Sequence, residues 1–289
     1  MRHPWSGVAL LVWLCLATAA QAQSSVWKVS LGDNYLYIGG TIHLLTPADF
    51  PLPPAFDQAY GDADRIVLEA DLGTVQQSRF LRELLLQTTY SGDGSVLQDL
   101  SKETVLLLRA HLNERGIPPA SLFRLKPGML SITLTVLELR RLGFTEAGVD
   151  QHYLARAQQD RKALGYLESL DSQVGFLVNM GKGQEDQLIQ HTLAEMEALP
   201  AYMDVMRNAW RTGDLEQLRA VGLDPWVEQF PQLYDEILVK RNHNWLPEIR
   251  RLLATGETEL VLFGAMHLVG DDGVLALLED LGYGVQRLP

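Results

Sequence analysis

The sequence predicts an α/β protein whose sheet carries a large helical insertion. Short apolar segments of β-strand character occur near both ends of the 289-residue chain, and the last two of them are separated by one helical segment. Between the two ends, over about residues 76–255, apolar residues mostly recur at helical spacing. Helices that alternate with buried strands indicate an α/β sheet, into which the long helical stretch is inserted.

The first elements after the N-terminal segment form a predicted β-hairpin. Residues 26–29 and 35–38 are apolar, and the Gly-Asp-Asn sequence at 32–34 supplies the turn between them. Gly39 and Gly40 end the second strand, and a proline-rich loop leads to a short helix over 54–62. A buried strand over 65–69 follows.

The rest of the chain is mostly helical until the pattern returns to strands at its end. The predicted helices cover 76–88, 102–115, 128–142, 149–160, 184–212, 214–221, 226–239, 244–254 and 271–281. Three more strands are expected at 163–167, 259–263 and 284–288. No Ser/Gly-rich linker divides residues 23–289, so we expect a single domain.

The charge of the chain argues against a nucleic-acid partner. The sequence has 24 Lys and Arg residues and 36 Asp and Glu residues, which gives a formal charge of −12. Phosphate recognition depends on clustered basic side chains, and no basic run is longer than a pair such as Arg140-Arg141. The remaining composition, 47% hydrophobic and 21% charged, is that of a globular protein.

Residues 1–22 have the features of a secretory signal peptide. A basic start precedes the apolar run 8–16, and small residues end in Ala-Gln-Ala at 20–22. The run is shorter than the roughly 20 residues of a spanning helix, so we expect no stable membrane anchor. Because Cys15 is the single cysteine, the mature chain has none. We therefore expect a periplasmic or secreted protein whose chemistry relies on His, carboxylate, Ser, Thr or Lys side chains.

One local pattern occurs twice, once near each end of the mature chain. Gly40 to His43 and Gly264 to His267 both read Gly-x-x-His, both follow an apolar strand, and both precede a leucine. Glycine lets the backbone turn, so each histidine is expected at the carboxyl edge of the sheet, where open α/β sheets bind ligands. Two imidazoles in one crevice can bind a metal ion, or can act as general base and acid.

Glu69 ends another apolar strand and adds a carboxylate to this edge. Two histidines and one carboxylate form a sufficient ligand set for a divalent metal ion with positions open to water and substrate. Structural roles are the alternative: hydrogen-bonding histidines and a solvated or helix-capping glutamate. The H-E-x-x-H, G-x-S-x-G, Walker A and G-x-G-x-x-G motifs are absent from the sequence.

Taken in order along the chain, these motifs resemble the TraB/PrgY/GumN family, whose animal relatives are the Tiki proteases. The resemblance extends over about residues 26–288 and is closest to the exported GumN-like branch. It is carried by the segments Gly40-Thr41-Ile42-His43, Val67-Leu68-Glu69-Ala70-Asp71, Gly148-Val149-Asp150, Leu167-Glu168-Ser169, Arg241-Asn242 and Gly264-Ala265-Met266-His267.

The resemblance implies a mixed central sheet of the erythromycin-esterase and ChaN-like kind, with both Gly-x-x-His motifs and a glutamate at one site. By motif, His43, Glu69 and His267 would be the metal ligands and the catalytic centre. Arg241 and Asn242 match the family's Arg-Asn pair; the alternative for them is a helix-end cation with a capping amide. For the Tiki proteases the resemblance implies a peptidase dependent on a divalent metal ion such as manganese, cobalt or zinc.

The leading hypothesis is an exported metal-dependent hydrolase, which we expect to be a peptidase acting on a peptide or protein. The metal ion would polarise the scissile carbonyl and lower the pKa of a bound water from about 15.7 towards about 7. Glu69 would be a ligand or the general base, and Arg241 would stabilise developing negative charge. Two alternatives stay open: a metal-free hydrolase of esterase type with a histidine base, and a non-catalytic periplasmic protein that binds a peptide, haem or a metal ion.

Overall fold

The protein is a mixed α/β structure built on a six-stranded sheet, as the computed structural model shows for residues 24–71, 73 and 78–289. The predicted signal peptide lies outside these residues. The strand order is β4-β3-β5-β2-β1-β6. The strands are β1 (Val26–Leu31), β2 (Asn34–Thr41), β3 (Arg65–Leu68), β4 (Ala163–Tyr166), β5 (Glu259–Gly264) and β6 (Gly284–Arg287). The predicted α/β class is confirmed.

The pairing of the strands brings distant parts of the sequence together. β1 and β2 form the predicted antiparallel hairpin, and Gly32 in its turn has a φ of +62°. β2 and β3 both pair in parallel with β5, and β4 pairs in parallel with β3. β5 is buried along most of its length, as expected for a strand covered on both faces. The carboxyl ends of these four strands therefore meet at one edge.

Helices cover both faces of the sheet. On one face lie α1 (Pro54–Asp62) and α7 (Val149–Asp160), whose Phe56 and Tyr153 rings stack with their centroids 6.1 Å apart. The other face carries α14 (Lys240–Leu253) and α15 (Val274–Asp280), with Trp245 packed 5.5 Å from Phe263 of β5. These four aromatic side chains are among the largest that the fold buries completely.

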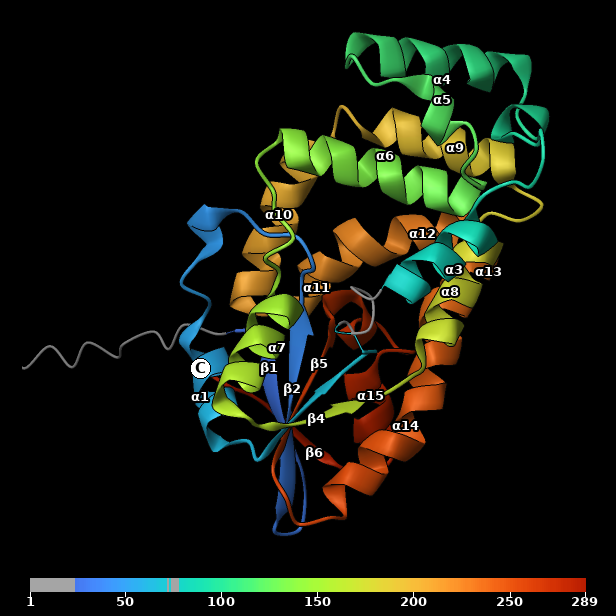
Figure 1. The fold of residues 1–289 in the computed structure, drawn as a ribbon. Coiled ribbons are helices and arrows are strands. Elements are labelled where there is room, and N and C mark those ends of the chain that lie inside the picture. Colours follow the sequence, from blue (N-terminus) through green and yellow to red (C-terminus); the bar gives the residue numbers. More distant parts are fainter. Residues whose placement is uncertain (1–23, 72, 74–77) are drawn as a thin grey trace, which may run out of the picture.

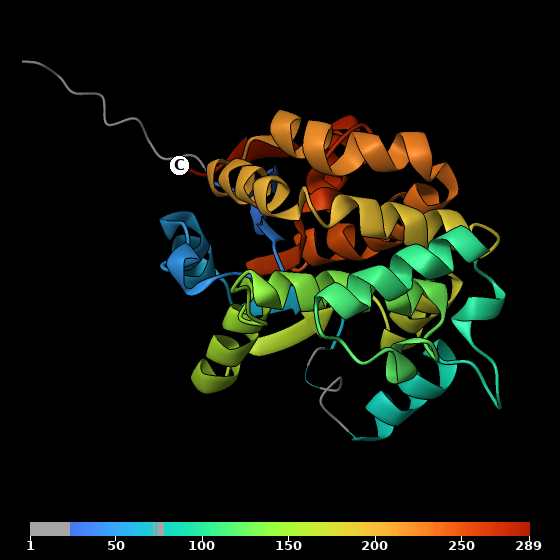
Figure 2. The same ribbon diagram turned by 90° about the horizontal axis from the view of Figure 1, so that it is seen from above.

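The remaining helices form a layer beyond the end of the sheet towards which β2 points (Figure 1). Seen from above, its green and gold helices lie side by side (Figure 2). The α-helices of this layer are α3 (Ser78–Thr88), α4 (Lys102–Glu114), α5 (Pro119–Leu122), α6 (Pro127–Arg141), α8 (Leu170–Asn179), α9 (Glu185–Glu195), α10 (Leu199–Thr212), α11 (Leu215–Leu218), α12 (Asp224–Gln229) and α13 (Pro231–Tyr234). Two π-helical segments (Arg219–Leu223 and Asp235–Val239) and three short 3₁₀ helices (Pro47–Asp49, Val96–Gln98 and Ala265–Leu268) also occur among the described residues.

Two of the differences between the predicted and the observed helices have identifiable reasons. The single helix expected over 184–212 is two helices, α9 and α10, and the second begins just before Pro200, which has no N–H to donate. The helix expected over 244–254 begins at Lys240 because the π-helical segment Asp235–Val239 runs directly into it. That earlier start puts the Arg-Asn pair on α14.

The helical layer has a hydrophobic core of its own. Leu108, Leu130, Leu134 and Ile189 are fully buried where α4, α6 and α9 pack together. Within the described residues, no helix is both long and apolar enough to cross a membrane.

Candidate active site

The two Gly-x-x-His segments leave the carboxyl edge of the sheet side by side. Parallel pairing of β2 with β5 aligns Thr41 with Gly264. A Cβ atom built on Gly264 would lie 3.4 Å from Glu69 Oε1, 3.7 Å from His267 Cδ2 and 3.9 Å from His43 Nε2. The open side of the Gly264 α-carbon thus faces the point where the two predicted histidines and the predicted glutamate converge.

His43 is positioned by the start of α7. A Cβ atom on Gly148 would lie 2.3 Å from the His43 carbonyl oxygen, so only glycine allows this approach. Val149 N–H donates to the Ile42 carbonyl at 3.1 Å and fixes the contact. Asp150 Oδ1 then lies 3.0 Å from His43 Nδ1. The His43 side chain is 60% exposed, and its Nε2 has no hydrogen-bond partner within the described part of the chain.

Arg241, the second residue of α14, is held on all sides by acceptors. Its Nη2 donates to Glu69 Oε2 at 2.5 Å and to Glu168 Oε1 at 2.7 Å, and its Nε donates to the Glu168 carboxylate at 3.2 Å. Its Nη1 lies 3.0 Å from His267 Nε2 and 3.2 Å from the Ile237 carbonyl oxygen. A guanidinium group has five N–H donors, and all five are accounted for. Arg241 is therefore arranged to position its neighbours, and it keeps no free donor for the developing negative charge expected of a substrate.

Asn242 holds the second histidine from the next position of the same helix. Its Oδ1 lies 2.5 Å from His267 Nδ1, and its Nδ2 donates to the Asp272 carbonyl at 2.7 Å. This arrangement places the His267 proton on Nδ1 and leaves the Nε2 lone pair to accept from Arg241. The Trp245 ring packs 4.4 Å from the imidazole, centroid to centroid, so His267 is buried and fixed.

The surroundings give these groups different charges at neutral pH. The Asp150 carboxylate raises the pKa of His43 to about 9, so this imidazole is mostly protonated. Burial disfavours ionisation of Glu69, but the Arg241 guanidinium, together with His43 and the Gly264 N–H, outweighs burial and lowers the pKa of the carboxyl to about 2. Burial, reinforced by the Arg241 charge, lowers the pKa of His267 to about 3 and keeps it neutral.

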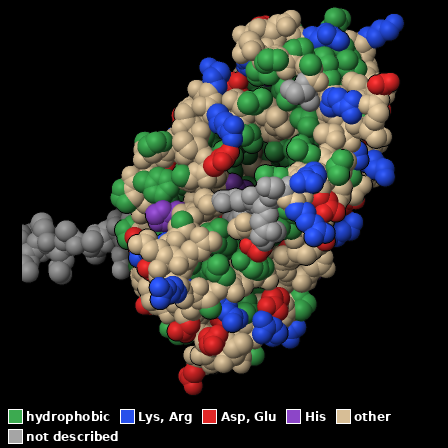
Figure 3. Space-filling model, in the orientation of Figure 1, with side chains coloured by type: hydrophobic (Ala, Val, Ile, Leu, Met, Phe, Trp, Pro, Cys, Tyr) green, Lys and Arg blue, Asp and Glu red, His purple; other side chains and the backbone are tan. Residues whose placement is uncertain are grey.

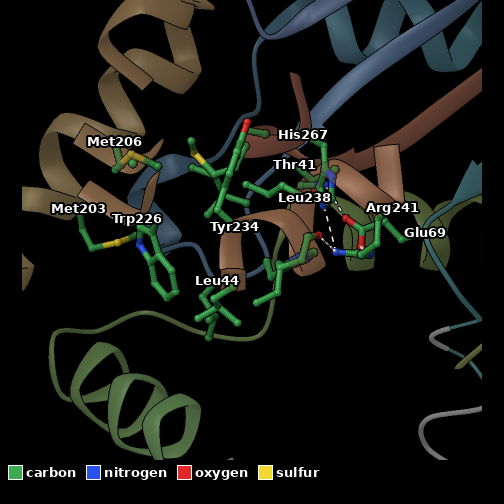
Figure 4. Close-up of a pocket in the computed structure, with 18 of the residues that line it drawn as sticks. Thr41, Leu44, Glu69, Met203, Met206, Trp226, Tyr234, Leu238, Arg241 and His267 are labelled. Carbon is green, nitrogen blue, oxygen red and sulfur yellow. Dashed lines mark hydrogen bonds and ion pairs between the residues drawn. The ribbon is translucent and has the colours of Figure 1, made fainter. Parts of the chain in front are cut away.

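A cavity of about 470 Å³ opens above this cluster of side chains, between the sheet and the helical layer. In the space-filling view, apolar side chains surround a hollow in this region (Figure 3). The polar residues lie at one end of the cavity, and Met203, Met206 and Trp226 lie at the other (Figure 4). Its volume is in the range of small-molecule sites, about 300–1,000 Å³.

The expected metal ligands are not arranged as a ligand set. Glu69 Oε2 and His267 Nε2, the atoms that would bind the ion, both accept hydrogen bonds from Arg241. A cation at that point would be repelled by the guanidinium unless Arg241 moved away. In keeping with this, the described residues contain no group of three or more His, Cys, Asp or Glu side chains able to hold a metal ion. The arrangement of His43, Glu69 and His267 therefore does not fit a bound metal while Arg241 occupies its place.

Two acidic residues of the site were not among the predicted site residues. Glu168 follows β4 as Glu69 follows β3, and its N–H donates to the Glu69 carbonyl at 2.9 Å. A Leu-Glu pair at the end of each strand was the signal available in the sequence. Asp150 is the second residue of α7, and no local motif linked it to a histidine 107 positions earlier.

Comparison with known proteins assigns the chain to a family. The TraB/PrgY/gumN family model matches residues 25–287. The chain belongs to the TraB/PrgY/gumN family. It is 25% identical over 250 residues to the uncharacterized protein YbaP of Escherichia coli (strain K12), covering 86% of this chain and 89% of YbaP. The match to YbaP of Shigella flexneri has the same identity and coverage. No solved structure matches the chain.

Proposed function

We propose that this TraB/PrgY/gumN family member is a hydrolase of amide or ester bonds in which His43, oriented by Asp150, transfers the proton. The proposal rests on the position of the His43 imidazole. Asp150 Oδ1 lies 3.0 Å from its Nδ1, while no described residue forms a hydrogen bond with its Nε2, and His43 lines the 470 Å³ cavity. Among the five predicted site residues, Arg241 already binds both Glu69 and His267.

The chemistry follows from this pairing of imidazole and carboxylate. Neutral His43 takes a proton from a water molecule through Nε2 as the water oxygen attacks the substrate carbonyl carbon. Asp150 stabilises the imidazolium that forms and keeps the ring oriented. The imidazolium then returns the proton to the departing nitrogen or oxygen as the carbon–heteroatom bond breaks. Glu69, Arg241 and His267 form the fixed floor against which the substrate is placed.

Several finer features are part of the same proposal. The signal-like residues 1–22 support export to the periplasm or the medium, and the family supports a sheet of the erythromycin-esterase and ChaN-like kind. A peptide or protein is the proposed substrate. A metal-dependent peptidase is the second candidate, because His43, Glu69 and His267 have the donor types of a divalent metal site. That candidate requires Arg241 to break its hydrogen bonds to two of the three proposed metal ligands, Glu69 and His267.

Cleavage of a peptide library tests the proposal and separates it from the second candidate. Purified mature protein is assayed before and after exhaustive chelation, alongside His43→Ala and His267→Ala. We expect cleavage that survives chelation and is lost in His43→Ala. Cleavage that stops on chelation, together with bound metal that is lost in both variants, would favour the metal-dependent enzyme. If the protein instead retains uncleaved peptides and no sample contains a cleavage product, it is a binding protein.

A further inference from the structure

The large cavity gives the proposed hydrolase a site for one particular class of substrate. We infer that its far end binds a bulky apolar group, such as a long acyl chain or an aromatic side chain, attached to the bond that is cleaved. This inference rests on the proposed function, because it assigns the reacting end of the cavity to His43. The occupant is the apolar part of the enzyme's own substrate.

The two ends of the cavity differ in chemistry. His43, Glu69 and Arg241 line one end, whereas Met203, Met206 and Trp226 line the other (Figure 4). A ligand that fills the whole cavity must therefore be polar where it meets His43 and apolar beyond that point. Water gains few hydrogen bonds at the apolar end, so its displacement by an apolar group is favourable.

Methionine is unusually frequent in the lining. Four of the seven methionines in the chain face this cavity: Met180, Met203, Met206 and Met266. Their unbranched thioether side chains change shape readily, which suits a site that accepts apolar groups of several shapes. The walls come from different elements, α10, the two π-helical segments and the 3₁₀ helix after β5, so a ligand would contact several parts of the fold at once.

Gly222 supports the same assignment from the packing of the wall. A Cβ atom on this residue would lie 2.8 Å from Met266 Sδ and 3.3 Å from Met206 Sδ. The missing side chain leaves room for the two thioethers to lie back against the π-helical segment. In a Gly222→Ala variant the thioethers would have to move, and the neighbouring cavity is the space open to them.

The test measures turnover and binding separately. p-Nitrophenyl esters with acyl chains of two, six and ten carbons report chain-length preference, and N-phenyl-1-naphthylamine, a neutral fluorophore, reports occupancy of the apolar end. We expect kcat/KM to rise with chain length, by up to about fourfold per methylene. The Met203→Gln/Met206→Gln double variant should lower the ratio of decanoate to acetate turnover at least tenfold and weaken fluorophore binding. The matched Met203→Leu/Met206→Leu variant should keep both.

The possible outcomes separate the two proposals. Equal turnover of all three esters, with no fluorophore binding, overturns the apolar site and leaves the hydrolase standing. Fluorophore binding that is displaced by decanamide and lost in the Gln double variant supports the apolar site even if no ester is cleaved, and in that case the proposed hydrolase fails. If the Gln double variant does not fold, Gly222→Ala replaces it, with a reduced decanoate-to-acetate ratio as the expected result.

Discussion

Replacement of Arg241 by methionine is expected to destabilise the protein strongly at neutral pH. The guanidinium lies between the Glu69 and Glu168 carboxylates, whose side chains are only 13% and 9% exposed. Methionine fills much of the same space but leaves both buried carboxylates without their cation. Removal of one partner from a buried ion pair costs about 3–5 kcal/mol, so the free energy of unfolding at pH 7 should fall by about that amount.

The pH dependence gives a second estimate of the same interaction. The pKa of Glu69 is lowered from 4.5 to about 2 in the folded protein, which corresponds to about 3 kcal/mol. A group with a lowered pKa contributes stability above its unfolded value, and this contribution disappears as the pH falls from 4.5 towards 2. The wild-type protein should therefore lose this contribution in that window. The Arg241→Met variant has little of it to lose.

Urea unfolding followed by circular dichroism at pH 7 and pH 3, in chelator-containing buffer, measures both effects. The difference between wild type and Arg241→Met should be about 3–5 kcal/mol at pH 7 and clearly smaller at pH 3. Arg250→Met, an exposed position on the same helix, is the control and should change stability by less than about 0.5 kcal/mol. Equal midpoints for Arg241→Met and wild type at pH 7, or a difference that is unchanged at pH 3, would refute the account of the cluster.

Asp150, Gly264 and Thr41 each provide a further test of the site. Because Asp150 raises the pKa of His43 to about 9, turnover by a His43 base should increase with pH up to about that value. In Asp150→Asn the rising part of the pH–rate profile should move towards pH 6.5 and the maximal rate should fall. An unchanged pH–rate profile would contradict the pairing of His43 with Asp150. Gly264→Ala adds a methyl group at ordinary contact distance, 3.4–3.9 Å, from the Glu69, His267 and His43 side chains, and the φ of −50° at Gly264 is accessible to alanine. Turnover should therefore fall at least tenfold while the thermal midpoint stays within a few degrees. Full turnover would show that the substrate does not reach this point. Thr41 Oγ1 is buried and has no hydrogen-bond partner among the described residues. Thr41→Val should therefore raise the free energy of unfolding, measured by urea titration, by about 1 kcal/mol. A loss of stability would mean that the hydroxyl group does form a hydrogen bond.

The sequence predicted the parts of the site that depend on local pattern. Each Gly-x-x-His segment follows an apolar strand, and strands with their glycine ends can be recognised from alternation and turn residues alone. Glu69 was found in the same way. Glu168 comes shortly after a neighbouring strand in the same Leu-Glu pair, so a comparison of strand ends could have found it as well.

Other features of the site depend on contacts between distant residues. Asp150 reaches His43 because Gly148 packs against a loop more than 100 positions earlier, and spacing along the chain does not record that contact. All five N–H donors of Arg241 have acceptors, and this depends on the directions of the N–H groups, which only the placed side chains reveal. For this reason a ligand set that is plausible by residue type does not fit a metal ion in this arrangement.

Proton transfer by His43 is tested by comparing His43→Gln with wild type on p-nitrophenyl decanoate in metal-free buffer. General acid–base catalysis contributes about 10²–10⁴ in rate, so kcat/KM should fall by that factor. His152→Gln, an exposed histidine on α7, is the matched control and should retain wild-type turnover. Equal kcat/KM for His43→Gln and wild type would contradict the account.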